Sequence, residues 1–443
     1  MRSEIITEAP VEQAILVGVQ IGPARQQAIT LEASLEELEL LAGTAGISVL
    51  ADISQNLDSP NASTLIGKGK LEELKILLDE TGATTVIFDE ELEPRHQREL
   101  EAELGSKIKV LDRTALILDI FAQHAHTREG MLQVELAQLK YRLPRLTRAW
   151  SHLARQGGGG GGRAGSVGGV GLRGPGEKQL EVDRREIKSR IARLEDELDK
   201  VREQRSRYRE HRRKTNVPVV ALVGYTNAGK STLLNQLTGA DIYVADQLFA
   251  TLDPTTRQLE LPSGQTVLLT DTVGFIQKLP TTLVAAFRAT LEEISEADLL
   301  VHVVDISQEH ALHQRQTVLE TLESIGAGEI PMITAYNKVD LLSADQIELV
   351  RKLLEPDALL LSAARGIGLE ALNDQIAKEV ALAYQRVTVL IPYDQGKLVS
   401  IFHEKGHVSK VENLARGIRM EGTLPRQLVP MFMPFAVKGN KAN

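Results

Sequence analysis

Blocks of apolar and polar residues alternate along the first 112 positions and predict short strands and amphipathic helices. Short apolar runs at 14–19, 47–53, 85–88 and 108–111 fit buried strands. Between them, leucine-rich segments around 35–41, 71–78 and 95–104 have the spacing of helices. Strands that alternate with helices of this length predict a small α/β domain with a mostly parallel sheet.

One glycine-containing turn in this domain has two interpretations. The segment Leu65-Ile66-Gly67-Lys68-Gly69-Lys70 is similar to a phosphate-binding loop, but it lacks the full Walker spacing. A tight turn that leads into a helix explains the same glycines. Both interpretations stay open at the level of sequence.

Two heptad patterns of apolar residues then predict a pair of long helices within residues 113–214. The first comprises Leu132, Leu136, Leu139, Leu143, Leu146, Trp150 and Leu153, and the second comprises Leu180, Ile187, Ile191, Leu194, Leu198, Val201 and Tyr208. Two such helices joined by a loop predict an antiparallel hairpin. Pro144 interrupts the first pattern and should kink that helix.

The loop of this hairpin, residues 157–176, is rich in glycine and basic. Residues 127–214 hold 22 Lys and Arg against 12 Asp and Glu, a net charge of +10, whereas the whole chain carries −9 and the remainder therefore −19. This asymmetry predicts a polyanionic partner at the hairpin, and Arg163 and Arg173 are the candidate contacts with RNA phosphates. The alternatives are a flexible linker for the loop and a solvated pair of helices for the charge.

The clearest motif of the chain is a glycine loop between an apolar run, 217–223, and a helix-forming segment, 232–237. Strand, loop and helix in this order bind phosphate, because backbone N–H groups and the helix dipole face the anion. The motif reads Gly224-Tyr225-Thr226-Asn227-Ala228-Gly229-Lys230-Ser231. Lys230 is expected to reach the β- and γ-phosphates, and the Ser231 hydroxyl is expected to bind Mg²⁺.

Three further elements follow later strands and complete a guanine nucleotide site. Asp271-Thr272-Val273-Gly274 follows the strand 267–270, so that Asp271 can hold Mg²⁺ through water and the Gly274 N–H can bond the γ-phosphate. In Asn337-Lys338-Val339-Asp340, the Asp340 carboxylate can accept from both N1–H and the exocyclic amine of guanine, a donor pair that adenine lacks. Ser362-Ala363-Ala364 supplies a backbone N–H toward guanine O6.

A threonine that senses the γ-phosphate through Mg²⁺ should lie between the glycine loop and Asp271. The segment is Phe249-Ala250-Thr251-Leu252-Asp253-Pro254-Thr255-Thr256. Thr251, Thr255 and Thr256 are all candidates, and the spacing alone does not choose between them.

Length and composition support a multidomain α/β protein. The 443 residues suggest about three domains, and the patterns divide the chain into an N-terminal α/β domain (1–112), a helical hairpin (113–214), a P-loop GTPase domain (215–385) and a small C-terminal α/β unit (386–443). The absence of cysteine excludes disulfides, thiolate metal sites and cysteine nucleophiles. No apolar run approaches the ~20 residues of a membrane helix, and no signal peptide is evident, so we expect a cytoplasmic protein. We also expect a monomer.

These motifs resemble the HflX family of translation-associated GTPases over most of the chain. The segments that carry the resemblance are Gly168-Gly169-Val170-Gly171-Leu172-Arg173-Gly174-Pro175-Gly176-Glu177, Leu180-Glu181-Val182-Asp183-Arg184-Arg185, 224–231, 249–253 and 271–275. The resemblance implies a stress-response protein that binds the large ribosomal subunit and separates stalled or idle ribosomes, with the hairpin loop near the peptidyl transferase centre. It also implies that Thr251 is the Mg²⁺-sensing threonine. Asn227 matches an asparagine with which related GTPases hold K⁺, although Tyr225-Thr226 departs from their usual Gly-x-Pro-Asn pattern.

The catalytic residue is not identified by the sequence. Many GTPases place a water-orienting glutamine after Asp-x-x-Gly, but Phe275 stands there in this chain. We therefore expect slow intrinsic hydrolysis that depends on a partner. Two alternatives to a ribosome-splitting GTPase remain: an ATP-driven RNA remodeller with a second nucleotide site in the N-terminal domain, and a ribosome-silencing factor that does not use hydrolysis.

Overall fold

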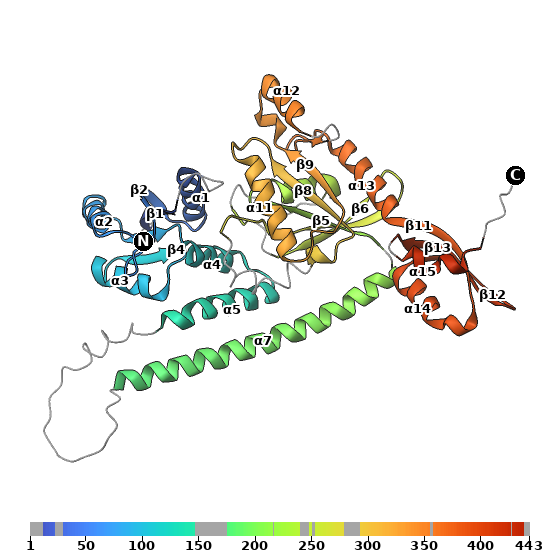
Figure 1. Cartoon of the computed structure of the whole chain (residues 1–443), viewed down its shortest axis with the longest axis horizontal. Helices are drawn as coiled ribbons and strands as arrows, with labels where there is room; N and C mark the ends of the chain where they lie inside the picture. The colour runs from blue at the N-terminus through green and yellow to red at the C-terminus, as the bar shows by residue number, and fades with distance from the viewer. Residues whose placement is uncertain are drawn as a thin grey trace, which may run out of the picture. The chain divides into compact units, whose positions relative to one another are not determined.

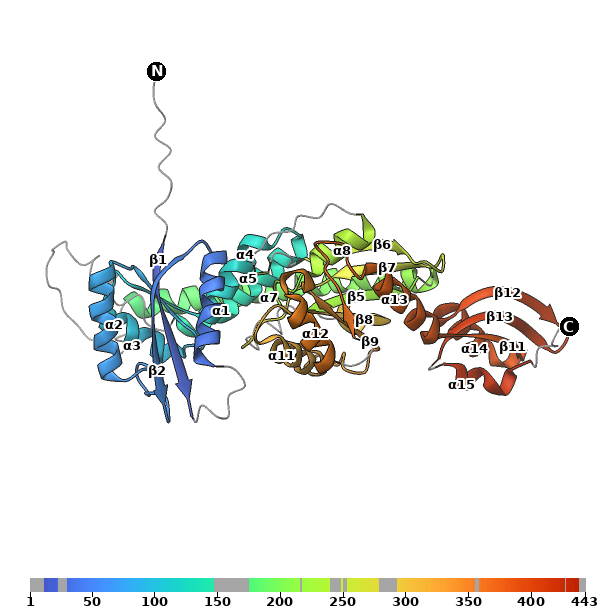
Figure 2. The same cartoon turned by 90° about the horizontal axis from the view of Figure 1, so that it is seen from above.

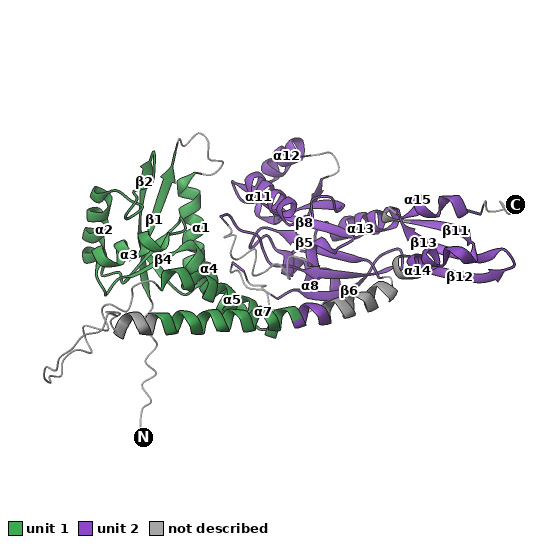
Figure 3. Ribbon diagram, turned by 60° about the horizontal axis from the view of Figure 1, so that its bottom comes forward, with its two compact units in different colours: residues 1–199, 279–287 green, residues 200–278, 288–443 purple. Residues whose placement is uncertain are grey.

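The computed structural model describes residues 12–22, 30–146, 175–215, 217–239, 248–249, 253–278, 293–354, 358–426 and 428–437. The chain forms two compact units, residues 1–199 with 279–287 and residues 200–278 with 288–443 (Figure 3). The main division falls within the long helix α7 (Pro175–Thr215).

Unit 1 is built on a four-stranded sheet whose described strands all run parallel. The strands are β1 (Gln13–Ile21), β2 (Ser48–Leu57), β3 (Thr85–Phe88) and β4 (Lys109–Asp112), in the order β2-β1-β3-β4 (Figure 1). The helices of this layer are α1 (Leu31–Thr44), α2 (Lys68–Thr81), α3 (Pro94–Leu104) and α4 (Arg113–His124). The predicted small α/β domain with a parallel sheet is confirmed.

The two faces of this sheet are covered by different helices, because successive side chains of β1 point in opposite directions. Ile15 and Val17 belong to a core with the leucines of α2, whereas a Cβ atom at Gly18 would lie 3.0 Å from Leu31 and Leu35 of α1. Figure 2 shows α2 and α3 on one side of the sheet and α1 on the other.

The turn at residues 65–70 is the start of a helix. Gly67 is the N-cap of α2, and its N–H donates to the side-chain oxygen of Gln55 at 2.9 Å. Lys70 pairs with Glu73 at 2.7 Å. Because the Gly67 amide is used within the fold, this geometry supports the tight-turn interpretation rather than a phosphate loop.

The hairpin helices pack against each other in opposite directions, as the heptad patterns predict. Helix α5 (Arg128–Arg145) lies along the first part of α7 (Figure 1), and their shared core consists of Leu132, Leu136, Leu194 and Leu198, with Leu139 and Ile191 at its edge. Ion pairs flank this core, Arg190 with Glu135 at 2.7 Å and Lys140 with Glu195 at 2.8 Å. Pro144 lies in the last turn of α5, which ends one residue later, and Trp150 and Leu153 lie outside the described residues.

An arginine in that last turn ties α5 to the sheet. The guanidinium of Arg145 donates to the Leu92 carbonyl at 2.6 Å and to the Asp112 carboxylate at 3.3 Å, and it stacks over the ring of Tyr141 at 3.5 Å. The Tyr141 hydroxyl donates to the same Asp112 at 2.8 Å. The end of α5 is therefore fixed on the carboxyl end of β4.

Unit 2 contains the six-stranded sheet that carries the predicted nucleotide motifs. Its strands are β5 (Val219–Gly224), β6 (Thr255–Glu260), β7 (Thr266–Asp271), β8 (Leu299–Asp305), β9 (Met332–Asn337) and β10 (Leu359–Leu360), in the order β10-β9-β8-β5-β7-β6. Only β6 is antiparallel to its neighbour among these described strands. The associated helices are α8 (Lys230–Thr238), α11 (Ala311–Ser324), α12 (Ala344–Leu353), α13 (Leu369–Ala383) and the short η2 (Val339–Leu341).

The last part of the chain is a three-stranded antiparallel sheet with short helices. Its elements are β11 (Tyr384–Ile391), η3 (Tyr393–Gln395), α14 (Gly396–Lys405), β12 (His407–Leu414), β13 (Gly417–Pro425), α15 (Val429–Phe432) and η4 (Met433–Phe435). The core includes Phe402 and Phe432, whose rings pack edge to face with their centroids 5.4 Å apart. The multidomain α/β class is thus confirmed, while the boundaries at 112, 214 and 385 stay predictions.

Arg113 gives a first test of what holds unit 1 together. Its guanidinium lies 3.0 Å from Glu37 and 3.1 Å from Asp89, and the Arg113 and Asp89 side chains are at most 2% exposed. Arg113→Ala should cost about 3–5 kcal/mol, because it leaves buried carboxylates without their countercharge. Hydrogen exchange of the β1 and β3 amides measures this loss within unit 1.

The matched control is Arg128→Ala, which removes a pair whose arginine is 80% exposed. That change should cost less than about 1 kcal/mol. Equal protection of β1 and β3 in the two variants would contradict the structural role of Arg113.

Candidate nucleotide-binding site

The predicted motifs meet at one edge of the six-stranded sheet, since they follow the carboxyl ends of neighbouring parallel strands. The glycine loop follows β5, Asp271 ends β7, Asn337 ends β9 and Ser362 follows β10. This edge is where open α/β sheets bind their ligands.

The glycine loop has a backbone that only particular residues can adopt. Gly224 and Gly229 have positive φ angles of 153° and 92°, and Asn227 has a φ of 57°, a conformation that asparagine tolerates better than most residues. A Cβ atom at Gly224 would collide with the Val303 carbonyl of β8, and one at Gly229 would collide with the Asn337 side-chain amide. Both glycines are therefore required by close packing as well as by conformation.

Lys230, the first residue of α8, folds back over this loop. Its ammonium donates to the carbonyls of Gly224 at 3.1 Å and Tyr225 at 2.8 Å. Burial lowers the pKa of Lys230 to about 8, although nearby Asp271 favours the charged form. The lysine is thus held as a buried cation inside the loop, where a bound polyphosphate would compensate its charge.

Ser231 and Asp271 form the candidate magnesium position. The Ser231 hydroxyl donates to Asp271 Oδ2 at 2.6 Å, and Asp271 is fully buried. A hydroxyl and a carboxylate are oxygen donors of the kind that Mg²⁺ prefers. In the described part of the chain no cluster of three or more His, Cys, Asp or Glu could hold a metal. The donor set therefore fits an ion completed by phosphate oxygens and water rather than by a protein cage.

The segment after Asp271 is joined to the glycine loop through its backbone. A Cβ atom at Gly274 would lie 2.8 Å from Thr226 Cα and 3.1 Å from Lys230 Nζ, so no side chain fits there. Phe275 is 2% exposed; its carbonyl accepts from the Thr226 N–H at 2.8 Å, and its N–H donates to the Gly224 carbonyl at 3.1 Å. The Phe275 ring is therefore packed in the interior, where it cannot orient a water. Thr272 and Val273 connect Asp271 to Gly274. The Thr272 hydroxyl donates to the Leu222 carbonyl at 2.6 Å.

The base-selecting loop is braced by Asn337. Its side-chain amide donates to the Ala228 carbonyl of the glycine loop at 2.8 Å, and its side-chain oxygen accepts from the Ala363 N–H at 2.9 Å. Val339 is buried, whereas Asp340 and Ala364 are exposed. Asp340 is therefore presented at the surface while the residues behind it are fixed.

Asp305 is a site residue that sequence reasoning missed. Lys338, whose φ is 66°, places its ammonium 2.7 Å from Asp305 Oδ2, and the other Asp305 oxygen accepts from the N–H and hydroxyl of Ser307. A carboxylate at the end of the buried strand β8 was the available signal. The pair fixes the Lys338 side chain at the base-selecting loop.

Some predicted residues cannot be placed. Ala250, Thr251 and Leu252 lie outside the described residues, so the choice of threonine stays a prediction. Phe249, with a φ of 57°, is buried, and Asp253 is half-buried. Arg163 and Arg173 also lie outside the described residues. Among the helices that the structure does describe, none has the length and apolar character to cross a membrane.

Comparison with known proteins identifies the family of the chain. Family models described as the N-terminal part and the middle region of a GTP-binding GTPase match residues 32–122 and 124–212, and one described as a 50S ribosome-binding GTPase matches 219–338. A crystal structure of a GTP-binding protein from Sulfolobus solfataricus in complex with GDP is 27% identical, covers 84% of this chain and 99% of that chain, and has a TM-score of 0.40.

Two curated relatives extend over nearly the whole sequence. GTPase HflX of Alkalihalophilus pseudofirmus is 49% identical over 398 residues, 89% of each chain. GTPase HflX of Caldanaerobacter subterraneus subsp. tengcongensis is 45% identical over 426 residues, 96% of this chain and 94% of the relative. This chain therefore belongs to the HflX family of GTPases, and its activity is the hydrolysis of GTP to GDP and phosphate.

Proposed function

We propose that this GTPase binds the large ribosomal subunit and its rRNA, separates stalled or idle ribosomes, and hydrolyses GTP slowly until the ribosome activates it. The match of residues 219–338 to a 50S ribosome-binding GTPase supports the partner. The observation that carries the proposed mechanism is the buried Phe275, whose backbone is tied to the glycine loop. A GTPase site without its own water-orienting side chain needs a partner to complete it.

The roles of the site residues follow from their positions. Lys230 and the N–H groups of the glycine loop bind the β- and γ-phosphates, while Asp340 and a backbone N–H of the segment 362–364 select guanine. Mg²⁺, when bound, neutralises charge between the phosphates, and Ser231 and Thr251 are its proposed direct ligands, with Asp271 acting through water. Asn227, in its left-handed conformation, is the proposed ligand for K⁺.

Two observations support this proposal over an ATP-driven remodeller with a second nucleotide site. The Gly67 amide, which a phosphate loop would present to its ligand, is occupied by Gln55. A pocket of the N-terminal sheet is lined by Glu32, Glu36, Glu39 and Asp52 and, as far as the described residues go, by no basic side chain, so it would repel a polyphosphate.

The first expected result concerns the base. Asp340→Asn should shift preference from GTP toward xanthosine triphosphate, and it should weaken GTP binding about 10- to 150-fold, because a charge-assisted pair to the guanine amine is lost. Competition binding with a fluorescent GDP analogue measures both affinities. The control is Asp345→Asn on α12, which removes an equal charge close in sequence; unchanged GTP affinity in Asp340→Asn would remove the assigned base pocket.

The second expected result concerns activation. Turnover by the isolated protein should be slow and should rise by up to roughly 10³–10⁵-fold with large ribosomal subunits, the range that external positioning groups supply in other GTPases. Phosphate release with and without subunits measures this ratio. Equal rates of GTP turnover with and without subunits would contradict dependence on a partner. Equal rates in KCl and NaCl would contradict only the assignment of K⁺ to Asn227.

The third expected result concerns the hairpin loop. Replacing Arg163 and Arg173 with alanine should weaken subunit binding and reduce its salt dependence by up to about two units of slope, at ~0.7–0.9 per phosphate contact. Co-sedimentation across a salt series measures this, and separation of 70S ribosomes under GTP, GDP and a non-hydrolysable analogue tests splitting itself.

Nucleotide affinity is the internal control for that variant, because the glycine loop lies in unit 2 and should bind GTP as before. Normal subunit binding at every salt concentration would assign the basic charge to the helix flanks. Splitting that is equal under GTP and GDP would favour a silencing factor that does not use its GTPase.

A further inference from the structure

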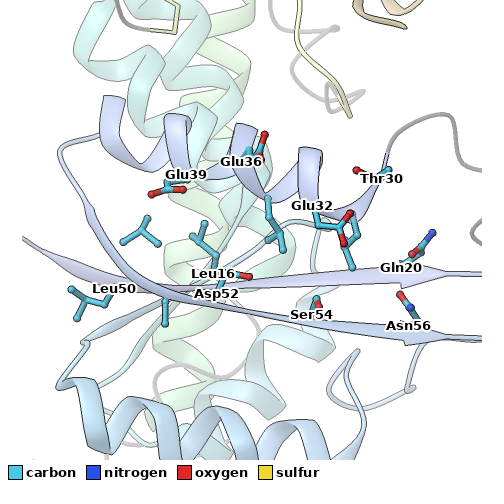
Figure 4. A pocket seen from close by; sticks show the side chains of 14 residues that line it. Leu16, Gln20, Thr30, Glu32, Glu36, Glu39, Leu50, Asp52, Ser54 and Asn56 are labelled. Atoms are coloured by element: carbon cyan, nitrogen blue, oxygen red, sulfur yellow. The ribbon is translucent and has the colours of Figure 1, made fainter. Parts of the chain in front are cut away.

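A groove in unit 1 has no part in the nucleotide chemistry. It lies between α1 and the edge strand β2, has a volume of about 680 Å³, and is lined mainly by side chains of these two elements and of β1 (Figure 4). Its floor includes Leu50, Asp52 and Ser54 of β2, which face α1 and remain exposed. No described residue covers this strip of the sheet beside α1.

The charge of this groove has one sign. Glu32, Glu36 and Glu39 lie along one side of α1, and Asp52 faces them from β2 (Figure 4). Among the described residues, no lysine, arginine or histidine lines the groove. None of the four carboxylates has a hydrogen bond or ion pair within the described part of the chain. Glu32 lies in the first turn of α1, where the helix dipole favours an acid. Glu36 and Glu39 have no such role, and like charges three and four residues apart on a helix are slightly destabilising.

The side chain of Gln20 gives an independent indication of a ligand. Gln20 of β1 is 7% exposed, and its side chain lines the groove close to Asn56, at the end opposite Leu50 (Figure 4). Its amide has no hydrogen-bond partner among the described residues. Because the Gln20 side chain lines the groove, its amide is available to donate to and accept from the backbone of a bound chain.

The edge strand determines the form of the ligand. In the order β2-β1-β3-β4, the outer edge of β2 has no described neighbour, so its backbone can pair with an added strand. Leu50 is 39% exposed and offers an apolar contact. We propose that this groove binds an extended segment of a partner protein that carries alternating lysine or arginine side chains, which pair with the carboxylates of α1 and Asp52. RNA is repelled by the same charge.

A peptide-binding experiment with the full chain tests this proposal. The probe is a nine-residue fluorescein-labelled peptide of alternating lysine and valine, followed by fluorescence anisotropy. The variant Glu32→Gln, Glu36→Gln, Glu39→Gln should bind it about tenfold or more weakly, equivalent to ~1.4 kcal/mol. A peptide with glutamate in place of lysine should not bind.

The matched control removes three other unpaired acids of the same unit. Asp79→Asn, Glu80→Gln, Glu99→Gln on α2 and α3 changes the net charge equally and should leave peptide affinity unchanged. An equal loss of peptide affinity in both variants would mean that only long-range charge matters, and it would contradict the proposed binding in the groove. Failure of the parent protein to bind the peptide would contradict it as well. Circular dichroism melting of the variants verifies that both remain folded.

A crosslinking experiment places the bound peptide directly, because the chain has no cysteine of its own. Ser54→Cys on the groove floor, labelled with a benzophenone, should crosslink to the lysine–valine peptide on illumination. Asp79→Cys on α2 is the control position. Crosslinking at position 54 no stronger than at position 79 would overturn the proposal even if the peptide binds.

Discussion

The side chain of Asn337 is the contact on which the nucleotide site depends. Its two ends bond to backbone groups of two other loops, the Ala228 carbonyl and the Ala363 N–H, 109 and 26 residues away in sequence. Both hydrogen bonds are buried, so the position of each of the three loops depends on the other two. Gly229 follows from the same constraint, since any side chain there would occupy the space of the Asn337 amide.

A second set of contacts determines how the site handles catalysis. The Phe275 backbone pairs with Gly224 and Thr226, and the Gln277 N–H donates to the Tyr225 hydroxyl at 2.9 Å. These bonds hold the backbone after Asp271 beside the glycine loop, and the Phe275 ring is buried. Under the proposed function, geometry and nucleotide selection belong to the chain, and a partner completes the hydrolytic machinery.

Basic and acidic side chains have different places in unit 1. Its interior uses arginines as connectors, Arg113 between Glu37 and Asp89, and Arg145 between Asp112 and the Leu92 carbonyl. The arginines predicted to bind RNA belong to the glycine-rich sequence 157–176, whereas every charged residue that the structure describes in the groove beside α1 is acidic. The proposed contact with a polyanion and the proposed acidic groove for a basic chain would serve two partners that do not compete for one surface.

The sequence by itself determined the elements and the chemistry of the nucleotide site. Strand, glycine loop and helix around Lys230, and the acids and amides after β7 and β9, are encoded in short contiguous motifs whose spacing carries the mechanism. The heptad patterns likewise predicted the antiparallel packing of Leu132 and Leu136 on Leu194 and Leu198, since a repeated apolar position identifies the face that a helix buries.

Tertiary structure alone decided the contacts between residues far apart in the chain. The pairing of Asp305 with Lys338, the use of the Gly67 amide by Gln55 and the burial of Arg113 depend on which strands are neighbours, and no local pattern states that order. The acidic groove is the clearest case. Glutamates at 32, 36 and 39 look like an ordinary solvated helix face in sequence, and they become the wall of a groove only because β2 is left at the edge of the sheet beside them.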